Sequence, residues 1–395
     1  MKLEVMEQSA SINDEQLATE RLAALDQLLP TFAERAAQHD KAGTFVHENV
    51  EDLRAARFYS AAVPVEYGGS GVSHAQMVGY IRSLGRVCPA TALTASMHQH
   101  IVSANVYNAR NGRGGEKLLR KVAASEVVLV STGAGDWLSS TGVMTPVAGG
   151  YRYTGRKSFA SGCEAAQMLA TSGRLGDEVL HFGLPLSAEG VVIGDDWDTL
   201  GMRGTGSQTV TLTDVFVPEE AITTRRPAGE WHPLWAVVAT VAMPLIMAAY
   251  VGLADAAVEL AVAGAKASLQ PKGAEGPTAD DTEIAMTAHE LGELRLAHVA
   301  VDNSMAALLA NAADLDFEPT VERAERAFVN KGLVATAVRS TLDKAFTLSK
   351  GRAFYRRNAL ERLLRDSYGA GLHPLQEREL LQFSGRFALG MDPVR

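Results

Sequence analysis

Hydrophobic residues recur at helical spacing in the first third of the chain and again in its C-terminal part. In residues 13–62, leucines repeat at intervals of three and four with charged residues between them, which is the pattern of amphipathic helices. Ser73 can cap a further helix, another begins near Pro89, and a last one covers residues 115–124. This part of the chain predicts a helical domain over residues 1–126.

The pattern changes to strand spacing between residues 127 and 220. The segment begins with the β-branched run VVLV and ends with VTLTDVFV, in which apolar and polar residues alternate. Glycine-rich turns separate these runs from others of similar length. We therefore expect an antiparallel β-barrel or sandwich as a middle domain, residues 127–225.

Long helical runs return in the last part of the chain, at residues 234–269, 281–312 and 319–349, followed by two shorter ones. Apolar residues at i, i+3, i+4 and i+7 predict a four-helix bundle over residues 226–395. The most apolar stretch, residues 235–253, contains proline and glycine and is followed by acidic residues. It is interpreted as a buried core helix rather than a membrane span.

Composition narrows the class of protein. Of the 395 residues, 47% are hydrophobic and 21% are charged, which is typical of a globular protein of two or three domains. A net charge of -9 argues against a nucleic-acid surface. Only Cys88 and Cys163 are present, which excludes a multi-cysteine metal site and favours a reducing compartment. The first residues contain no apolar signal core, so we expect a cytoplasmic protein with neither a membrane nor a nucleic acid as partner.

Five local motifs follow one another along the chain: PVEYGGSG, STGAG, GYRYTGRKSFASG, LGMRGTGSQTVTLTDVFVP and LERLLRD. With the order of helical, strand and helical regions, they resemble the acyl-CoA dehydrogenase superfamily of flavoenzymes over nearly the whole chain. The resemblance implies an α+β multi-domain fold of N-terminal α-domain, middle antiparallel β-barrel and C-terminal four-helix bundle. It also implies a flavin cofactor, FAD or FMN, and a homotetramer or homodimer.

The resemblance also places the flavin. Val130, Ser131 and Thr132 would lie along its pyrimidine edge, while Phe159 and Ser161 would flank the ring and hydrogen-bond near N5. Backbone amides and hydroxyls can satisfy such a polar edge, and glycines let the backbone approach closely. The alternative is a glycine-rich hairpin turn that holds no ligand.

Two positions depart from the family pattern for the cofactor. Asp136, predicted in the substrate pocket, stands where the family has a serine that reaches a phosphate or the substrate, and a carboxylate would repel a phosphate. Gly351 is the one glycine left of a turn that serves the neighbouring subunit's flavin. Arg352, Arg356 and Arg357 can contact phosphates there or form a solvated basic rim. Weaker anchoring suits an enzyme that borrows reduced flavin.

The catalytic base of acyl-CoA dehydrogenation is missing. The glutamate that follows the family's Arg-Asp element corresponds here to Pro374, and the alternative family position falls near Ala242. His373 stands beside the gap, and a histidine there can handle protons near neutral pH. Flavin-dependent monooxygenases of the superfamily resemble this arrangement. They use oxygen and reduced flavin that a separate reductase supplies.

Three further side chains are candidates for the site. Arg203 lies in a loop that the family keeps beside the active site, where it can orient a substrate carbonyl, stabilise negative flavin or simply hold the loop. His98 and His100 lie two apart on one helix and point to different faces, so only one can line the pocket. We predict His98 there, with His100 as the alternative, and either can instead be a packing or capping histidine. Their spacing predicts no metal site.

Three functions remain open from the sequence. A flavin-dependent monooxygenase with His373 handling protons and Arg203 assisting is favoured. The alternative is an α,β-dehydrogenase that acts on acyl-CoA or on an acyl group bound to a carrier protein, with a relocated base. The third is a non-catalytic flavin-binding protein. The expected substrate is accordingly a small molecule or an acyl thioester.

Overall fold

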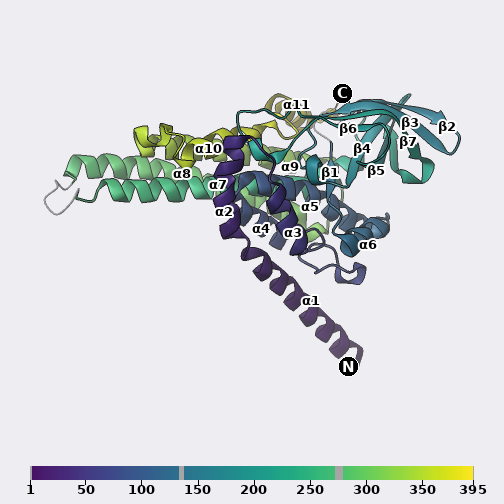
Figure 1. The fold of residues 1–395 in the computed structure, drawn as a ribbon, viewed down its shortest axis with the longest axis horizontal. Helices are drawn as coiled ribbons and strands as arrows, with labels where there is room; N and C mark the ends of the chain where they lie inside the picture. Colours follow the sequence, from purple (N-terminus) through teal and green to yellow (C-terminus); the bar gives the residue numbers. More distant parts are fainter. Residues whose placement is uncertain (1, 133–137, 272–278, 395) are drawn as a thin grey trace.

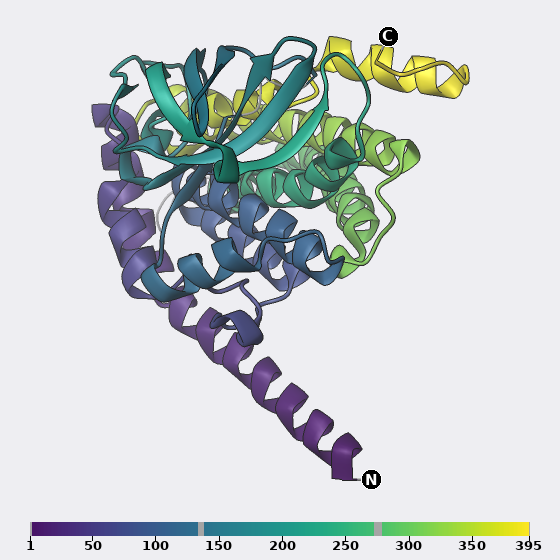
Figure 2. The same cartoon turned by 90° about the vertical axis from the view of Figure 1, so that its right-hand side faces the viewer.

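A computed structural model describes residues 2–132, 138–271 and 279–394. Its N-terminal region is helical, as the sequence predicts, and its first helix extends away from the body of the molecule (Figures 1 and 2). The helices of this region are α1 (Lys2–Asp26), α2 (Leu29–Ala42), α3 (His47–Ala55), α4 (His74–Val87), α5 (Pro89–Arg110) and α6 (Glu116–Ser125).

The C-terminal region is a set of long helices, shown in green and yellow in Figure 1. The bounds of the three longest agree with the predicted ones within two residues at either end, because each follows an uninterrupted apolar repeat. The helices are α7 (Pro233–Ser268), α8 (Asp281–Ala312), α9 (Val321–Ser349), α10 (Ala359–Ser367) and α11 (Glu377–Ala388). Short 3₁₀ turns called η6 (Lys350–Phe354) and η7 (Tyr368–Leu372) flank α10.

The middle region is one sheet at one end of the molecule. Its strands are β1 (Leu129–Ser131), β2 (Val143–Val147), β3 (Gly150–Lys157), β4 (Met168–Leu175), β5 (Glu178–Pro185), β6 (Val191–Ile193), β7 (Val210–Pro218) and β8 (Ile222–Pro227). The strand order is β6-β7-β3-β2-β4-β5-β8, and β1 pairs with β4 in parallel.

The predicted antiparallel β-barrel is therefore wrong in two respects. The sheet is open, because β6 and β8 stand at opposite ends of the strand order without pairing to each other. It is also mixed, since β4 runs parallel to both β1 and β2. Alternation along a strand shows which face is buried but not which strand lies next to it. The alternation of apolar and polar residues therefore could not predict whether the sheet closes into a barrel.

Helix α7 is the centre of the helical part of the molecule. It is long and apolar enough to cross a membrane, yet 94% of its most apolar window is buried inside the protein. It packs closely on α4, where a Cβ at Gly85 would lie 2.3 Å from the Ala249 oxygen and one at Gly252 would lie 2.0 Å from the Arg82 oxygen. Residues of the N-terminal helices and of the C-terminal helices consequently belong to one hydrophobic core, separate from the core of the sheet.

Candidate active site

The carboxyl end of β1 presents the first predicted flavin contacts. Val130 is buried, and Ser131 is paired with Ala170 of β4. The Thr132 amide donates to the Ala170 oxygen at 3.2 Å, and its hydroxyl lies 2.6 Å from that of Thr171. These contacts bring the hydroxyl groups of Thr132 and Thr171 together at the carboxyl end of β1. Asp136, the next predicted residue, lies outside the described part of the chain.

The loop after β3 provides the second group. Phe159 is 53% exposed and meets Trp197 edge to face at 5.5 Å. Ser161 is half-buried, and Gly162 has a φ of +87° that favours glycine. A Cβ at Gly162 would lie 3.5 Å from Thr94, so this loop rests directly on α5. An exposed aromatic ring beside a half-buried hydroxyl has the chemistry that a flat heteroaromatic ring with polar edges requires, so these residues fit a flavin.

The two histidines of α5 have different surroundings. The Leu129 amide donates to His98 Nδ1 at 3.0 Å, which leaves the proton of the neutral ring on Nε2, 2.8 Å from the Tyr59 oxygen. Both nitrogens of His98 therefore join α5 to neighbouring backbone. His100 is close enough to His373 to help lower its pKa. This geometry favours His100 over the predicted His98 as the histidine that lies near His373 and the turn that carries it.

His373 is held by two side chains that the sequence did not single out. Its Nε2 lies 2.8 Å from the Tyr250 hydroxyl of α7. Lys331 of α9 donates from Nζ to the His373 oxygen at 2.7 Å and to the Leu375 oxygen at 3.1 Å. Tyr250 and Lys331 stand on helix faces whose spacing is that of ordinary core positions. No local signal distinguishes them.

The electrostatic setting keeps His373 neutral. Burial lowers its pKa well below the usual value, and the positive charge of Lys331 lowers it further. Burial also raises the pKa of Tyr250, so its hydroxyl keeps its proton. Burial lowers the pKa of Lys331 to about 8, so this side chain is mostly protonated at pH 7. The neutral imidazole can accept a hydrogen bond, while burial and the Lys331 cation disfavour its full protonation.

Arg203 contacts its own loop and the N-terminal helices. Its Nε donates to the Asp40 oxygen at 2.9 Å, and Nη1 donates to Asp198 at 3.0 Å and to the Thr199 oxygen at 2.9 Å. These contacts support the interpretation as a structural loop arginine. Its catalytic role stays a prediction.

Gly351 lies on the surface within η6, and a Cβ there would meet no atom within 4 Å. Its neighbours Phe354 and Tyr355 are 81% and 56% exposed, and Arg357 lies over the Tyr355 ring at 4.6 Å. An exposed, basic and aromatic segment is compatible both with a phosphate contact and with a solvated rim. The cofactor role of Gly351 therefore stays a prediction.

Asp366 is buried next to the loop that contains Arg203, and its ionisation makes the stability of the fold depend on pH. It accepts a hydrogen bond of 2.5 Å from the Met202 amide, while burial raises its pKa to about 6. The folded protein thus holds this proton more tightly than the unfolded chain, whose carboxyl has the ordinary value of 3.8. The favourable contribution is complete below pH 3.8 and is lost as the pH rises through about 6.

Asp366→Asn should remove that dependence, because asparagine can still accept from the Met202 amide and carries no charge. We expect the free energy of unfolding of the variant, relative to the natural protein, to rise by about 2 kcal/mol between pH 4 and pH 7. Urea unfolding at both pH values measures the difference, in which the titration of all other groups cancels. A difference that stays constant with pH would contradict the assignment.

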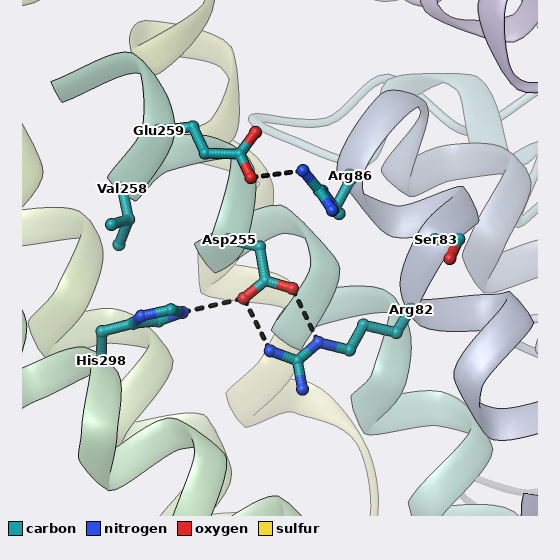
Figure 3. Close-up of a pocket in the computed structure, with 7 residues that line it drawn as sticks. All are labelled: Arg82, Ser83, Arg86, Asp255, Val258, Glu259 and His298. Carbon is teal, nitrogen blue, oxygen red and sulfur yellow. Dashed lines mark hydrogen bonds and ion pairs between the residues drawn. The ribbon is translucent and has the colours of Figure 1, made fainter. Parts of the chain in front are cut away.

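A hollow of about 350 Å³ lies elsewhere, between α4, α7 and α8 (Figure 3). Within it, Arg82 donates to both oxygens of Asp255, at 2.7 and 2.8 Å, and His298 lies 2.8 Å from the same carboxylate. A second pair, Arg86 with Glu259, closes its rim. The hollow is thus lined by charges that already neutralise one another.

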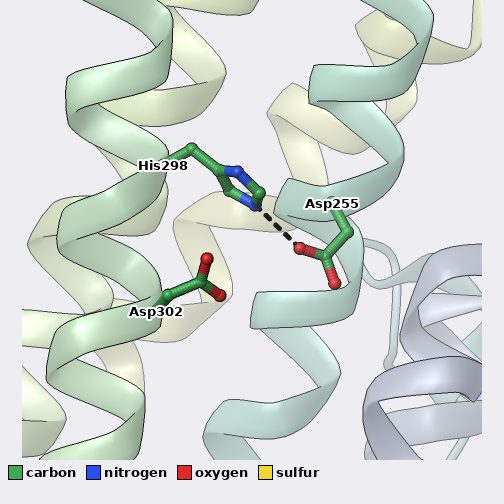
Figure 4. A group of neighbouring side chains, drawn as sticks. All are labelled: Asp255, His298 and Asp302. Atoms are coloured by element: carbon green, nitrogen blue, oxygen red, sulfur yellow. Dashed lines mark hydrogen bonds and ion pairs between the residues drawn. The ribbon is translucent and has the colours of Figure 1, made fainter.

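Asp255, His298 and Asp302 form a group of potential metal ligands among the described residues (Figure 4). Arg82, however, also donates to Asp302 at 2.8 Å. A guanidinium that bonds both carboxylates supplies the positive charge a metal ion would bring and would repel such an ion. We interpret the group as an ion-pair cluster that joins α4 to the bundle.

Comparison with known proteins agrees with this geometry. The family model of the acyl-CoA dehydrogenase N-terminal domain matches residues 19–126, and that of the acyl-CoA dehydrogenase C-terminal domain matches residues 245–377. The chain is 25% identical over 395 residues to the flavin-dependent monooxygenase oxygenase subunit HsaA of Rhodococcus jostii (strain RHA1), with 92% of this chain and 97% of HsaA covered. It is 26% identical over 379 residues to the putative acyl-CoA dehydrogenase YdbM of Bacillus subtilis (strain 168), with 91% and 93% covered.

Among solved structures, the FMN-bound form of TdsC from Paenibacillus sp. A11-2 superposes with a TM-score of 0.80 at 18% identity, over 94% of this chain and 97% of TdsC. The matched domains and the order of helices, sheet and bundle define a flavoenzyme fold. The chain belongs to the acyl-CoA dehydrogenase superfamily. It is a flavin-dependent oxidoreductase, so the predicted family, enzyme class and flavin cofactor are confirmed.

Proposed function

We propose that this protein is the oxygenase component of a flavin-dependent monooxygenase that receives reduced flavin from a separate reductase. The observation that carries the proposal is the neutral His373, fixed by Tyr250 and Lys331 in the turn where dehydrogenases of the family have a glutamate. The likeness to HsaA, whose name describes an oxygenase subunit, supports it over the whole chain.

The contacts of His373, Tyr250 and Lys331 define the role that we propose for each side chain. When bound, reduced flavin supplies the two electrons that oxygen needs for insertion of one atom into a substrate. The neutral imidazole of His373 accepts a hydrogen bond from a substrate hydroxyl or amine, which orients that group and raises its nucleophilicity. Tyr250 fixes the imidazole at Nε2, and Lys331 fixes the backbone that carries it. These two bonds hold the base in one position.

The alternative is dehydrogenation of an acyl thioester, which the likeness to YdbM favours. That reaction removes a weakly acidic α-proton, for which the family uses a carboxylate. Among the described residues, the neighbours that shift the pKa of His373 are the Lys331 cation and the His100 imidazole, and neither is a carboxylate. Carboxylate catalysis thus has no support in the described part of this turn.

The test compares both reactions on one preparation. Purified protein is mixed with oxygen and with FMN or FAD that an added reductase keeps reduced, and substrate oxygenation is followed with phenols, amino sugars and aromatic heterocycles. We expect oxygenated product only when reduced flavin is supplied. Flavin-loaded protein that is bleached by an acyl-CoA without a reductase, and that forms no oxygenated product, would contradict the proposal.

We further propose a homo-oligomer, a homotetramer or homodimer, built on the bundle. Large apolar side chains are exposed on α8, η6 and α11, among them Met286 (59%), Leu296 (75%), Phe354 (81%) and Leu381 (65%). The elements α8, η6 and α11 each contact α9, and exposed apolar side chains that gather on one surface are typical of packing against another copy. Light scattering on the purified protein measures the mass directly, and a monomer would contradict this part of the proposal.

A further inference from the structure

Three hydroxyl groups form a chain that leads from the candidate flavin site into the protein. The Ser161 and Ser207 hydroxyls are 2.7 Å apart, and the Ser207 and Thr205 hydroxyls are also 2.7 Å apart. The Thr205 hydroxyl ends the chain at the Met202 backbone oxygen, at 2.9 Å. Ser207 is 3% exposed and Thr205 is fully buried, so only half-buried Ser161 faces the site.

The inner end of the chain fixes the direction of every hydrogen bond in it. Each hydroxyl has one proton, whereas a carbonyl oxygen can only accept. Thr205 must therefore give its proton to Met202. The short contact between Thr205 and Ser207 then requires the proton of Ser207, and the contact between Ser207 and Ser161 requires the proton of Ser161. Ser161 is left with lone pairs alone to offer a ligand.

The acceptor at the inner end is held firmly. The Met202 oxygen also accepts from the Thr205 amide and from Trp197 Nε1, both at 3.1 Å. The Met202 amide is bound to Asp366, and the Thr205 oxygen accepts from the Gly162 amide at 2.9 Å. These bonds fix the backbone on both sides of the Thr205 hydroxyl. Its orientation is thus a property of the loop and does not depend on a ligand.

We propose that Thr205 and Ser207 are positioning residues that make Ser161 an obligate acceptor and thereby select reduced over oxidised flavin. The inference rests on the proposed function for the placement of Ser161 near flavin N5. Reduced flavin carries a proton on N5 and can donate it, whereas oxidised N5 offers only a lone pair. Against an acceptor-only serine, reduced flavin gains a hydrogen bond and oxidised flavin meets lone-pair repulsion. An oxygenase that borrows reduced flavin and releases the oxidised form requires this preference.

Thr205→Val is the sharpest test, because it keeps Ser161 and Ser207 and removes only the acceptor that fixes their direction. Without it, Ser207 can donate to Ser161, and Ser161 can then donate to oxidised N5. Dissociation constants of oxidised and reduced FMN, measured without oxygen, give the selectivity of each protein. We expect the natural protein to bind reduced FMN more tightly, and the variant to lose about tenfold of that ratio, the factor of one hydrogen bond. The midpoint potential of bound FMN should fall correspondingly by about 30 mV.

Two further variants complete the test. Thr205→Ser keeps the hydroxyl and should retain the natural ratio of FMN dissociation constants and the natural midpoint potential. If residue 205 acted only through packing, loss of its methyl group would change both quantities. Ser207→Ala cuts the chain in the middle and should lower the ratio as Thr205→Val does, which also covers failure of the valine variant to fold. As a matched control, Ser367→Ala removes a buried hydroxyl whose hydrogen bond within the described residues goes to the local Leu364 oxygen, and it should leave the ratio unchanged.

A natural protein without preference for reduced FMN, or an unchanged ratio in both Thr205→Val and Ser207→Ala, would overturn the inference. These outcomes are distinct from failure of the proposed function, because the binding ratio and the potential are measured without oxygen or substrate. If no substrate is oxygenated but the variants shift the ratio of FMN dissociation constants as expected, the role assigned to the three hydroxyl groups is supported and the monooxygenase proposal is contradicted.

Discussion

Replacing His373 with alanine is expected to lower kcat for substrate oxygenation by a factor of about 10² to 10⁴, the usual contribution of a positioned general base. The reason is that the imidazole, held at Nε2 by Tyr250, is the side chain of the turn that we propose to hydrogen-bond the reacting substrate group. Product formed per reduced flavin consumed measures the effect and separates substrate oxygenation from wasteful oxidation of the flavin.

The matched control is His289→Ala, since His289 lies on the outer face of α8 with 78% of its side chain exposed. It should leave both kcat and flavin binding unchanged.

The low pKa of His373 also predicts how activity depends on pH. His373 stays neutral from pH 6 to pH 8, so activity should not fall through the ordinary histidine pKa of about 6.5. Full turnover by His373→Ala would remove His373 from the mechanism.

Lys331→Met is expected to lower kcat by about 10²-fold while leaving the helices folded. Lys331 is 2% exposed, and its ammonium group holds the His373 and Leu375 oxygens. Methionine fills a similar volume but cannot donate, so the turn is no longer held to α9. A displacement of about 1 Å at a catalytic group costs this order of rate. Kinetics with saturating substrate, together with thermal unfolding, separate a misplaced base from a lost fold.

Lys344→Met is the control on the same helix. Lys344 pairs with Glu293 at 2.8 Å on the partly exposed side of α9, so its loss should change stability by less than about 1 kcal/mol and activity not at all. Equal activity losses in the two lysine variants would show that the effect comes from α9 as a whole. A Lys331→Met variant with natural kcat would show that the turn keeps its position without this contact.

The local parts of the fold could be predicted because they depend on neighbours in the chain. The helix over residues 281–312 has the bounds that its apolar repeat predicts. The capping of α4 by Ser73 was equally visible, and the structure adds the reciprocal bond, which the Ser73 amide donates to the Gln76 side-chain oxygen. Both features depend on contacts within four residues, where spacing and side-chain type are sufficient.

Pairing between distant segments was not predictable in the same way. The barrel prediction failed because strand alternation carries no information on whether β6 meets β8. The tight packing of α4 on α7 depends on Gly85 and Gly252, each of which could equally have been an ordinary helix glycine. The shared core of the N-terminal and C-terminal helices follows from that contact.

For the site, the sequence by itself identified the family and predicted both the flavin-binding loops and the turn in which His373 stands beside the missing glutamate. The tertiary structure decided what holds His373, since Tyr250 lies 123 residues from it and Lys331 lies 42 residues from it. It also decided the direction of the Ser161 hydrogen bond, which depends on a carbonyl oxygen two hydroxyls away. Residue types along a chain specify which groups can donate or accept. Only their positions in space determine which protons are already used, and therefore which chemistry remains for a ligand.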